Sequence, residues 1–254
     1  MGYAFLATII SAFTLLAQKF SLSELKVDHR HFNLVVFFFL ALTAFIWSSA
    51  QGTITSFFHL PLVGYLLLGA LVLLAFFWNS LFSYALAKEE MPEAELIISF
   101  NPLLTMLLAF LFFPEERKVV IFAPALIAGA SLVWSHWEKQ HLALSRQEKL
   151  ILLAVVGISV EALLIKELLH FLPPEALYAL RCAFALPLFA LLVLVRPPKT
   201  TLSLRALVFI ALIGVLATVQ MVSFYRAYEI IGITETILIS LLAPVVVMTF
   251  TPYF

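Results

Sequence analysis

The feature that most constrains this chain is a succession of apolar stretches, each about 20 residues long. A stretch of that length is enough to cross a bilayer as an α-helix. Only 12% of the 254 residues are charged and 63% are hydrophobic, whereas about 25% of the residues of a soluble domain are charged. A water-exposed surface therefore cannot be built from these residues, and the sequence predicts an all-α polytopic membrane protein.

Charged residues, prolines and turn residues divide the chain into nine predicted membrane-spanning helices. The connections between them are short, which leaves no room for a soluble catalytic or signalling domain. The nine predicted ranges are 2–20, 32–50, 61–87, 93–113, 119–136, 150–171, 174–195, 205–229 and 233–252.

Comparison of the chain with itself predicts two copies of one unit, residues 1–137 and residues 149–254. An odd number of helices in each copy inverts the second copy in the membrane, which is an architecture of secondary transporters with a site between the repeats. The matched residues are Phe82 with Phe224, Glu93 with Glu235 and Pro102 with Pro244 at a displacement of 142, and Thr14 with Glu161 and Lys19 with Lys166 at a displacement of 147.

The second predicted copy reaches Phe254 before a counterpart of the fifth helix (119–136) has appeared. The fold class predicted is thus two inverted five-helix repeats, the second lacking its last helix. Two interpretations remain open at this point, a shortened chain and a protein of nine helices. The excess of Lys and Arg in the connections on one side of the predicted helices places the N-terminus outside.

Three motifs in and between the fourth and fifth predicted helices resemble the EamA-like branch of the drug/metabolite transporter superfamily. They are Asn101-Pro102-Leu103-Leu104-Thr105, Pro114-Glu115-Glu116-Arg117 and Ala128-Gly129-Ala130-Ser131. In this resemblance Pro102 is the mid-helix proline, Glu115 the acidic residue after it and Gly129 the small residue of the fifth helix. The first copy departs from the pattern, because it lacks a Trp-Gly pair in its first helix and an arginine in its second.

The resemblance implies a ten-helix carrier of amino acids or other small organic metabolites, often an exporter, in the cell (inner) membrane. It also implies a cytoplasmic N-terminus, against the distribution of Lys and Arg, so the orientation stays open. The partners it implies are a small-molecule substrate and the lipid bilayer. A small-xxx-small pattern at Ala125 and Gly129 would allow close helix packing in a homodimer. The alternative function is a non-transporting membrane scaffold or subunit that needs a partner to complete its helix bundle.

Glu161 is the strongest candidate for a substrate-binding or coupling residue. It lies near the middle of the helix predicted at 150–171, where a carboxylate costs about 2.5–3.5 kcal/mol on insertion scales. It would bind an ammonium group or carry a proton, or it would be a structural carboxylate paired with Lys166 or Arg181. Arg181 would bind a substrate carboxylate, extend to the headgroups or pair with Glu161.

Further candidates are polar side chains and prolines within the predicted helices. Pro102 and Pro244 each remove a backbone donor and bend their helix, so the freed carbonyls line a cavity or the bend is one of packing alone. The polar candidates are Glu95, Ser99, Asn79, Ser83 and Gln220, and groups of this kind more often bond between helices than contact a ligand. One face of the first helix, with Thr8, Ser11, Thr14 and Gln18, is predicted to point inward.

Other classes of function have little support in the residues. Fifteen basic and fifteen acidic residues give no net charge, which does not favour a nucleic-acid partner. All six histidines lie in the predicted connections or near the ends of predicted helices, so no buried metal site is indicated and no metal or cofactor is expected. Hydrolase and nucleotide-binding motifs are absent, and an integral-membrane enzyme is therefore the weakest alternative. Lys19, Lys166 and the tryptophans are predicted to lie at membrane interfaces.

Overall fold

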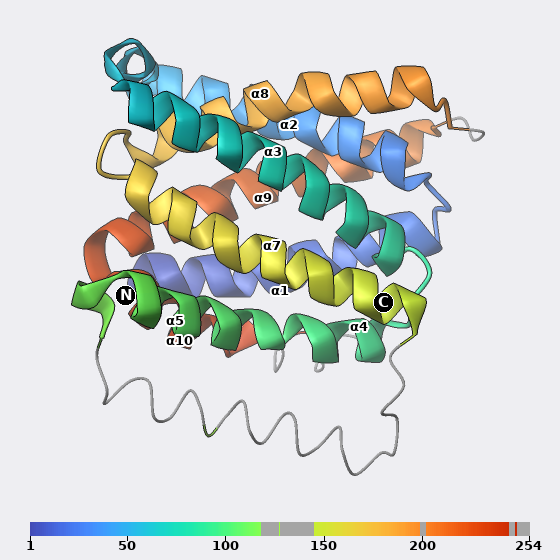
Figure 1. Cartoon of the computed structure of the whole chain (residues 1–254). Helices are drawn as coiled ribbons and strands as arrows, with labels where there is room; N and C mark the ends of the chain where they lie inside the picture. Colours follow the sequence, from blue (N-terminus) through green and yellow to red (C-terminus); the bar gives the residue numbers. More distant parts are fainter. Residues whose placement is uncertain (118–126, 128–144, 199–201, 244–246, 248–254) are drawn as a thin grey trace.

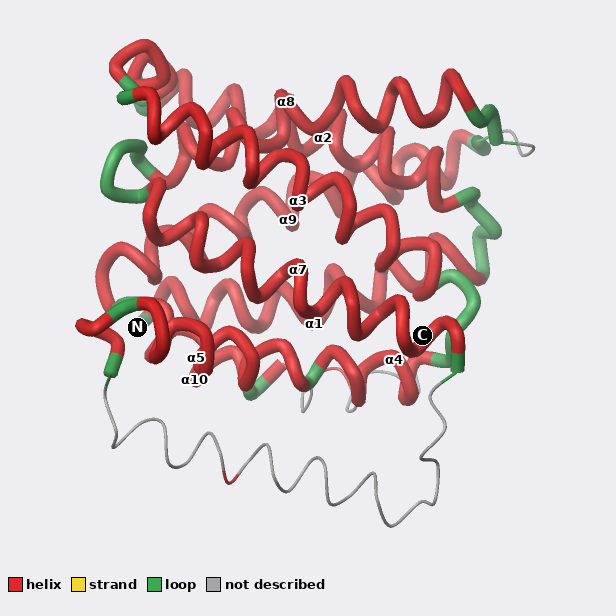
Figure 2. Tube along the Cα trace, viewed as in Figure 1, coloured by secondary structure: helices red, strands yellow, loops and turns green. Residues whose placement is uncertain are grey.

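The computed structural model describes residues 1–117, 127, 145–198, 202–243 and 247, and all regular structure among these residues is helical (Figure 2). Two short 3-10 helices, η1 (Ile54–His59) and η2 (Pro114–Glu116), lie in connections. The α-helices are α1 (Gly2–Ser23), α2 (His29–Ala50), α3 (Leu62–Leu86), α4 (Met91–Ile98), α5 (Phe100–Phe112), α7 (Arg146–Leu168), α8 (Pro174–Val195), α9 (Leu204–Ile231) and α10 (Ile233–Ser240).

Five of the described helices, α1, α2, α3, α8 and α9, are long and apolar enough to cross a membrane. Their outward-facing sides carry large exposed apolar residues, such as Phe45, Leu66 and Leu194. A contiguous apolar exterior of this kind is expected where lipid replaces water as the solvent. The prediction of an all-α polytopic membrane protein is confirmed. The predicted helix at 119–136 and the second half of the helix at 233–252 lie largely outside the described residues.

Side-chain caps fix the beginnings of α2, α7 and α9. Asp28 accepts a hydrogen bond from the backbone N–H of Arg30 at 2.9 Å, so α2 begins three residues before its predicted start at 32. Ser145 and Glu148 form a reciprocal capping box at the start of α7. Ser203 accepts a hydrogen bond from the backbone N–H of Ala206 at the start of α9. These caps satisfy backbone donors that have no partner within the helix.

The helix predicted at 93–113 is divided into α4 and α5 by a turn at Ser99. Pro102 has no backbone N–H for the carbonyl of Ile98, and its ring crowds that carbonyl, so the helix breaks one turn before the proline. α10 ends at Ser240, which is likewise four residues before a proline. Pro244 itself lies outside the described residues.

The closest helix packing joins the two predicted copies. The most extensive contacts run between α2 and α8, between α3 and α7, and between α1 and α9, whereas α1 touches α2 and α3 little. Figure 1 shows α2 and α8 along one side of the bundle and α5 and α10 along the opposite side. In the predicted repeat α1 corresponds to α7, and α3 corresponds to α9. The contact of α1 with α9 is therefore the counterpart of the contact of α7 with α3. The division into copies remains a prediction.

Gly157 allows α3 and α7 to approach closely. A Cβ atom at this position would lie 2.8 Å from the Cβ atom of Trp78, which is nearer than van der Waals contact permits. The close approach brings the indole of Trp78 on α3 to the same level as Glu161, one turn further along α7. The glycine thus positions the site described next.

Candidate functional site

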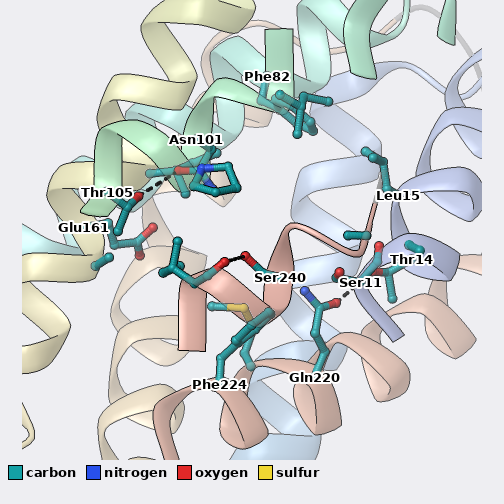
Figure 3. A pocket seen from close by; sticks show the side chains of 18 of the residues that line it. Ser11, Thr14, Leu15, Phe82, Asn101, Thr105, Glu161, Gln220, Phe224 and Ser240 are labelled. Atoms are coloured by element: carbon teal, nitrogen blue, oxygen red, sulfur yellow. Dashed lines mark hydrogen bonds between the residues drawn. The ribbon is translucent and has the colours of Figure 1, made fainter. Parts of the chain in front are cut away.

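A cavity of about 280 Å³ lies in the middle of the bundle, between helices of both predicted copies (Figure 3). Its wall contains residues of α1, α3 and α5 from the first copy and of α7, α9 and α10 from the second. The break between α4 and α5 and the end of α10 both belong to it. Discontinuous helices that meet near the middle of a membrane protein are a common way to build a solute site. The polar residues of its wall are Ser11, Thr14, Gln18, Trp78, Asn79, Ser99, Asn101, Thr105, Glu161, Gln220, Tyr228 and Ser240.

Glu161 is the carboxylate in the described part of the cavity wall, and two donors hold it. The Nε atom of Arg181 donates to Oε1, and the indole Nε1 of Trp78 donates to Oε2. The Glu161 and Arg181 side chains are each 3% exposed. A buried pair with such contacts is retained only if both charges are compensated. Of the alternatives for Glu161, the structure pairs it with Arg181 and not with Lys166.

Arg181 does not line the cavity. Its guanidinium lies behind Glu161, in a buried region of α8 that also contains Tyr178 and Cys182. A solute in the cavity would therefore meet the carboxylate first and the guanidinium only through it. This placement does not favour the interpretation of Arg181 as the group that binds a substrate carboxylate, nor its extension to the headgroups.

A second polar contact crosses the cavity wall between α1 and α9. The hydroxyl of Thr14 donates to Oε1 of Gln220 at 2.7 Å. The predicted repeat matches Thr14 with Glu161, and at the displacement of 142 it matches Trp78 with Gln220. The contact of Thr14 with Gln220 therefore occupies the position in one half that the contact of Glu161 with Trp78 occupies in the other. Among the described residues of the cavity wall, charge is confined to the half that contains Glu161.

The other predicted site residues differ in where they lie. Asn79, Ser99 and Pro102 line the cavity. Ser83 does not, since its hydroxyl donates to Oδ1 of Asn33 at 2.8 Å and accepts from Gln18, which makes it a bridge between helices. The side chain of Glu95 and all of Pro244 lie outside the described part of the structure.

The inward face predicted for the first helix is confirmed, because Ser11, Thr14 and Gln18 line the cavity and Thr8 is buried. Asn101 was not among the sequence candidates, although it lines the cavity beside Pro102. Its position directly before a proline that breaks the helix is the signal that indicates it. Trp78, predicted as an interface residue, instead contacts Glu161.

The two lysines predicted at membrane interfaces contact backbone carbonyls. Lys19 Nζ donates to the carbonyl of Leu86 at 2.9 Å, and Lys166 Nζ to the carbonyl of Tyr228 at 3.4 Å. Each amine lies on the first helix of its predicted copy and caps the carboxyl end of the third. A cation at that end interacts favourably with the helix dipole.

Glu116 joins the two predicted copies beside the carboxyl end of α9. Its two carboxylate oxygens accept hydrogen bonds from the backbone N–H groups of Ile233 and Thr234, at 2.9 and 3.0 Å, at the start of α10. Lys166 Nζ lies 3.7 Å from the same carboxylate. In the resemblance the acidic residue was Glu115, but that side chain is exposed and Glu116 is buried.

We expect Glu116→Gln to lower the free energy of unfolding by about 1–3 kcal/mol, because the amide would turn an N–H group toward a backbone N–H group and lose the negative charge. Glu115→Gln is the matched control, and its effect should stay within about 0.5 kcal/mol. Chemical unfolding of detergent-solubilised protein measures both. Equal effects of the two substitutions would contradict this account of the contact.

The same contact has a predicted pH dependence. Burial alone raises the pKa of Glu116, but the N–H groups of Thr234 and Ile233 and the charge of Lys166 outweigh it and hold the pKa below its ordinary value. The contribution of Glu116 to stability is therefore complete above about pH 4.3, the usual value for glutamate, and is lost as the pH falls through the lower folded pKa. Unfolding at several pH values should show this loss in the unmodified protein and not in Glu116→Gln.

Gly232 gives the chain the conformation that places α10 on Glu116. Its φ is +87°, and a Cβ atom here would lie 2.5 Å from Oε1 of Glu116. We expect Gly232→Ala to destabilise the protein by about 1–3 kcal/mol. Gly69→Ala on α3 is the control, since nothing lies within 4 Å of its added Cβ, and it should be neutral or slightly stabilising. A Gly232→Ala protein as stable as the control variant would contradict this role.

The arrangement defines a polytopic membrane protein with a solute-sized cavity between helices from its two halves. A family model described as the EamA-like transporter family matches residues 1–136 and 147–254. The chain therefore belongs to the EamA-like transporter family, within the drug/metabolite transporter superfamily, and is an integral membrane protein of a family of small-solute transporters.

A solved structure titled "Crystal structure of protein" has the same fold, with a TM-score of 0.71 over 97% of this chain and 88% of that chain. The two sequences are 17% identical, so the likeness concerns the fold alone. No curated protein matches the sequence.

Proposed function

We propose that the protein is a secondary transporter that exports small, amino-acid-like organic solutes across the cell membrane by alternating access. The observation that carries the proposal is a buried carboxylate, Glu161, on the wall of a cavity built from both halves of the chain. A carboxylate at that depth is costly and is retained mainly where it binds a solute or an ion. The outward direction and the class of solute come from the family resemblance.

The size of the cavity supports a solute of this class. At about 280 Å³ it lies near the lower end of the range for ligand sites, roughly 300–1,000 Å³. Phe82 and Phe224, which the predicted repeat pairs, supply apolar surface in its wall. The described part of the wall therefore combines apolar rings, neutral hydrogen-bonding groups and one carboxylate. A small zwitterion with an apolar side chain would use all three.

Alternating access would use the interrupted helices. The turn at Ser99 and the end of α10 interrupt helical hydrogen bonding beside the cavity, so the segments on either side can change angle without disrupting a continuous helix. Transport would be driven by the solute gradient or by a proton carried on Glu161. We propose no enzymatic reaction, and a homodimer remains a proposal because Ala125 and Gly129 lie outside the described residues.

The test is exchange of labelled amino acids by purified protein in proteoliposomes. We expect saturable, gradient-driven efflux of at least one amino acid, with competition by unlabelled solute. Absence of exchange across a full amino-acid panel, together with stoichiometric copurification of a helical membrane protein, would overturn the proposal in favour of a scaffold or subunit. A homodimer predicts about twice the monomer mass in detergent-corrected light scattering.

A further inference from the structure

A solute of the proposed class has an acidic end, and on the transport function proposed above the cavity has to contain a group that recognises it. Arg181 would be the obvious choice, but its guanidinium lies behind Glu161 and outside the cavity wall. The described part of the wall contains no arginine and no lysine. A carboxylate in the cavity would therefore have to be held by neutral donors.

Asn101 presents such donors. Its Oδ1 atom accepts hydrogen bonds from the hydroxyls of Thr105, at 3.1 Å, and Ser159, at 3.0 Å. The structure assigns the oxygen of the amide to the end that faces these two hydroxyls, and the Nδ2 atom to the other end. The Nδ2 atom has no hydrogen-bond partner among the residues that the structure describes. Both of its N–H donors are consequently available to a solute.

The position of Asn101 suits a carboxylate beside an ammonium group. It is linked through Ser159 to the helix that holds Glu161, two residues further along α7. Figure 3 shows Asn101, Thr105 and Glu161 together on one wall of the cavity, with Gln220 on the opposite wall. Asn101 also lies in the first turn of α5, where the helix dipole favours negative charge.

We propose that Asn101 is the residue that recognises the carboxylate of the transported solute, while Glu161 binds its ammonium group. In an α-amino acid the two charged groups are attached to one carbon atom, so a single wall has to supply both partners. Asn101 and Glu161 form that wall, and the apolar remainder of the cavity takes the side chain. Asn101 is then a specificity-determining residue for solutes that carry a carboxylate.

The test is the substitution Asn101→Asp, because it keeps the oxygen that accepts from Thr105 and Ser159 and replaces only the free amide donors. Proteoliposome exchange of an amino acid is measured against two unlabelled competitors, the same amino acid and its decarboxylated amine. The ratio of their inhibition constants gives the preference for the acid, that is, for the amino acid over the amine that lacks its carboxylate. We expect Asn101→Asp to lower this preference about tenfold or more, since a hydrogen bond to a charged group is lost and a repulsion is added.

Gln220→Glu is the matched control. Gln220 also lines the cavity and its Nε2 atom has no partner among the described residues, while its Oε1 atom accepts from Thr14. The substitution adds the same charge to the same cavity from the opposite wall. We expect a clearly smaller fall in the preference for the acid than Asn101→Asp produces.

The outcomes separate the inference from the function on which it rests. A fall for Asn101→Asp no greater than that for Gln220→Glu would overturn the inference and leave the transport function standing. Failure of the unmodified protein to exchange any amino acid would overturn both. If Asn101→Asp does not fold, Asn101→Ser replaces it, because serine is smaller and has no amide donors. We expect Asn101→Ser to show the same loss of preference for the acid. An unchanged preference in that variant would overturn the inference.

Discussion

Glu161→Gln is expected to lower solute exchange at least about tenfold, and close to the limit of detection for solutes that carry an ammonium group. The amide is nearly isosteric with the carboxylate and can still accept from Trp78, but it carries no charge for an ammonium group and no site for a transferable proton. Proteoliposome exchange as a function of pH measures both effects. Any pH dependence that Glu161 sets should disappear in the variant.

Glu167→Gln is the control for this prediction. Glu167 lies on the same helix, α7, but its side chain is exposed. We expect its substitution to leave the rate of exchange and the dependence on pH unchanged. If Glu161→Gln retained both the rate and the pH dependence of the unmodified protein, Glu161 would be a structural carboxylate and would have no part in transport.

Arg181→Met is expected to destabilise the protein by about 3–5 kcal/mol, because it leaves the carboxylate of Glu161 buried without its cation. The double variant Glu161→Gln with Arg181→Met should recover much of this stability, since neither charge is then buried alone. It should not recover transport. Unfolding in detergent or in lipid gives the free energies, and the exchange assay gives the activity.

The control for Arg181→Met is Arg205→Met on α9, where the side chain is exposed. Its effect on the free energy of unfolding should stay within about 0.5 kcal/mol. Equal stabilities of Arg181→Met and Arg205→Met would mean that the buried pair contributes nothing. A double variant no more stable than Arg181→Met would show that the cost arises from lost packing and not from an unpaired charge.

Much of the architecture was predictable because it depends on local composition. The lengths of the apolar stretches and the charges that flank them predict helices whose bounds are close to those of α1, α3 and α8. The start of α2 was missed by three residues, since the charged run before it hides a capping aspartate. The break at Ser99 was also missed, although Pro102 was predicted to bend its helix.

The site was predictable only in part, because its contacts join helices that are distant in the sequence. The depth of Glu161 and the polar face of α1 are visible in single helices, and both lie at the cavity. The contact of Trp78 with Glu161 is not visible in that way, since it depends on how closely α3 approaches α7. Which of Glu115 and Glu116 is buried against α10 depends on the single turn of η2, and no periodicity in the sequence specifies the orientation of that turn.

The central claim is that the cavity beside Glu161 is the place where the solute binds during transport, and site-directed labelling tests it most directly. The chain has a single cysteine, Cys182, which is buried, so Cys182→Ala with Ser11→Cys places one reactive thiol on the cavity wall. The measurement is the rate at which a water-soluble maleimide labels that thiol in proteoliposomes, with and without transported amino acid. We predict that the solute slows labelling at concentrations that match its KM for exchange. A labelling rate unchanged by saturating solute would contradict the account.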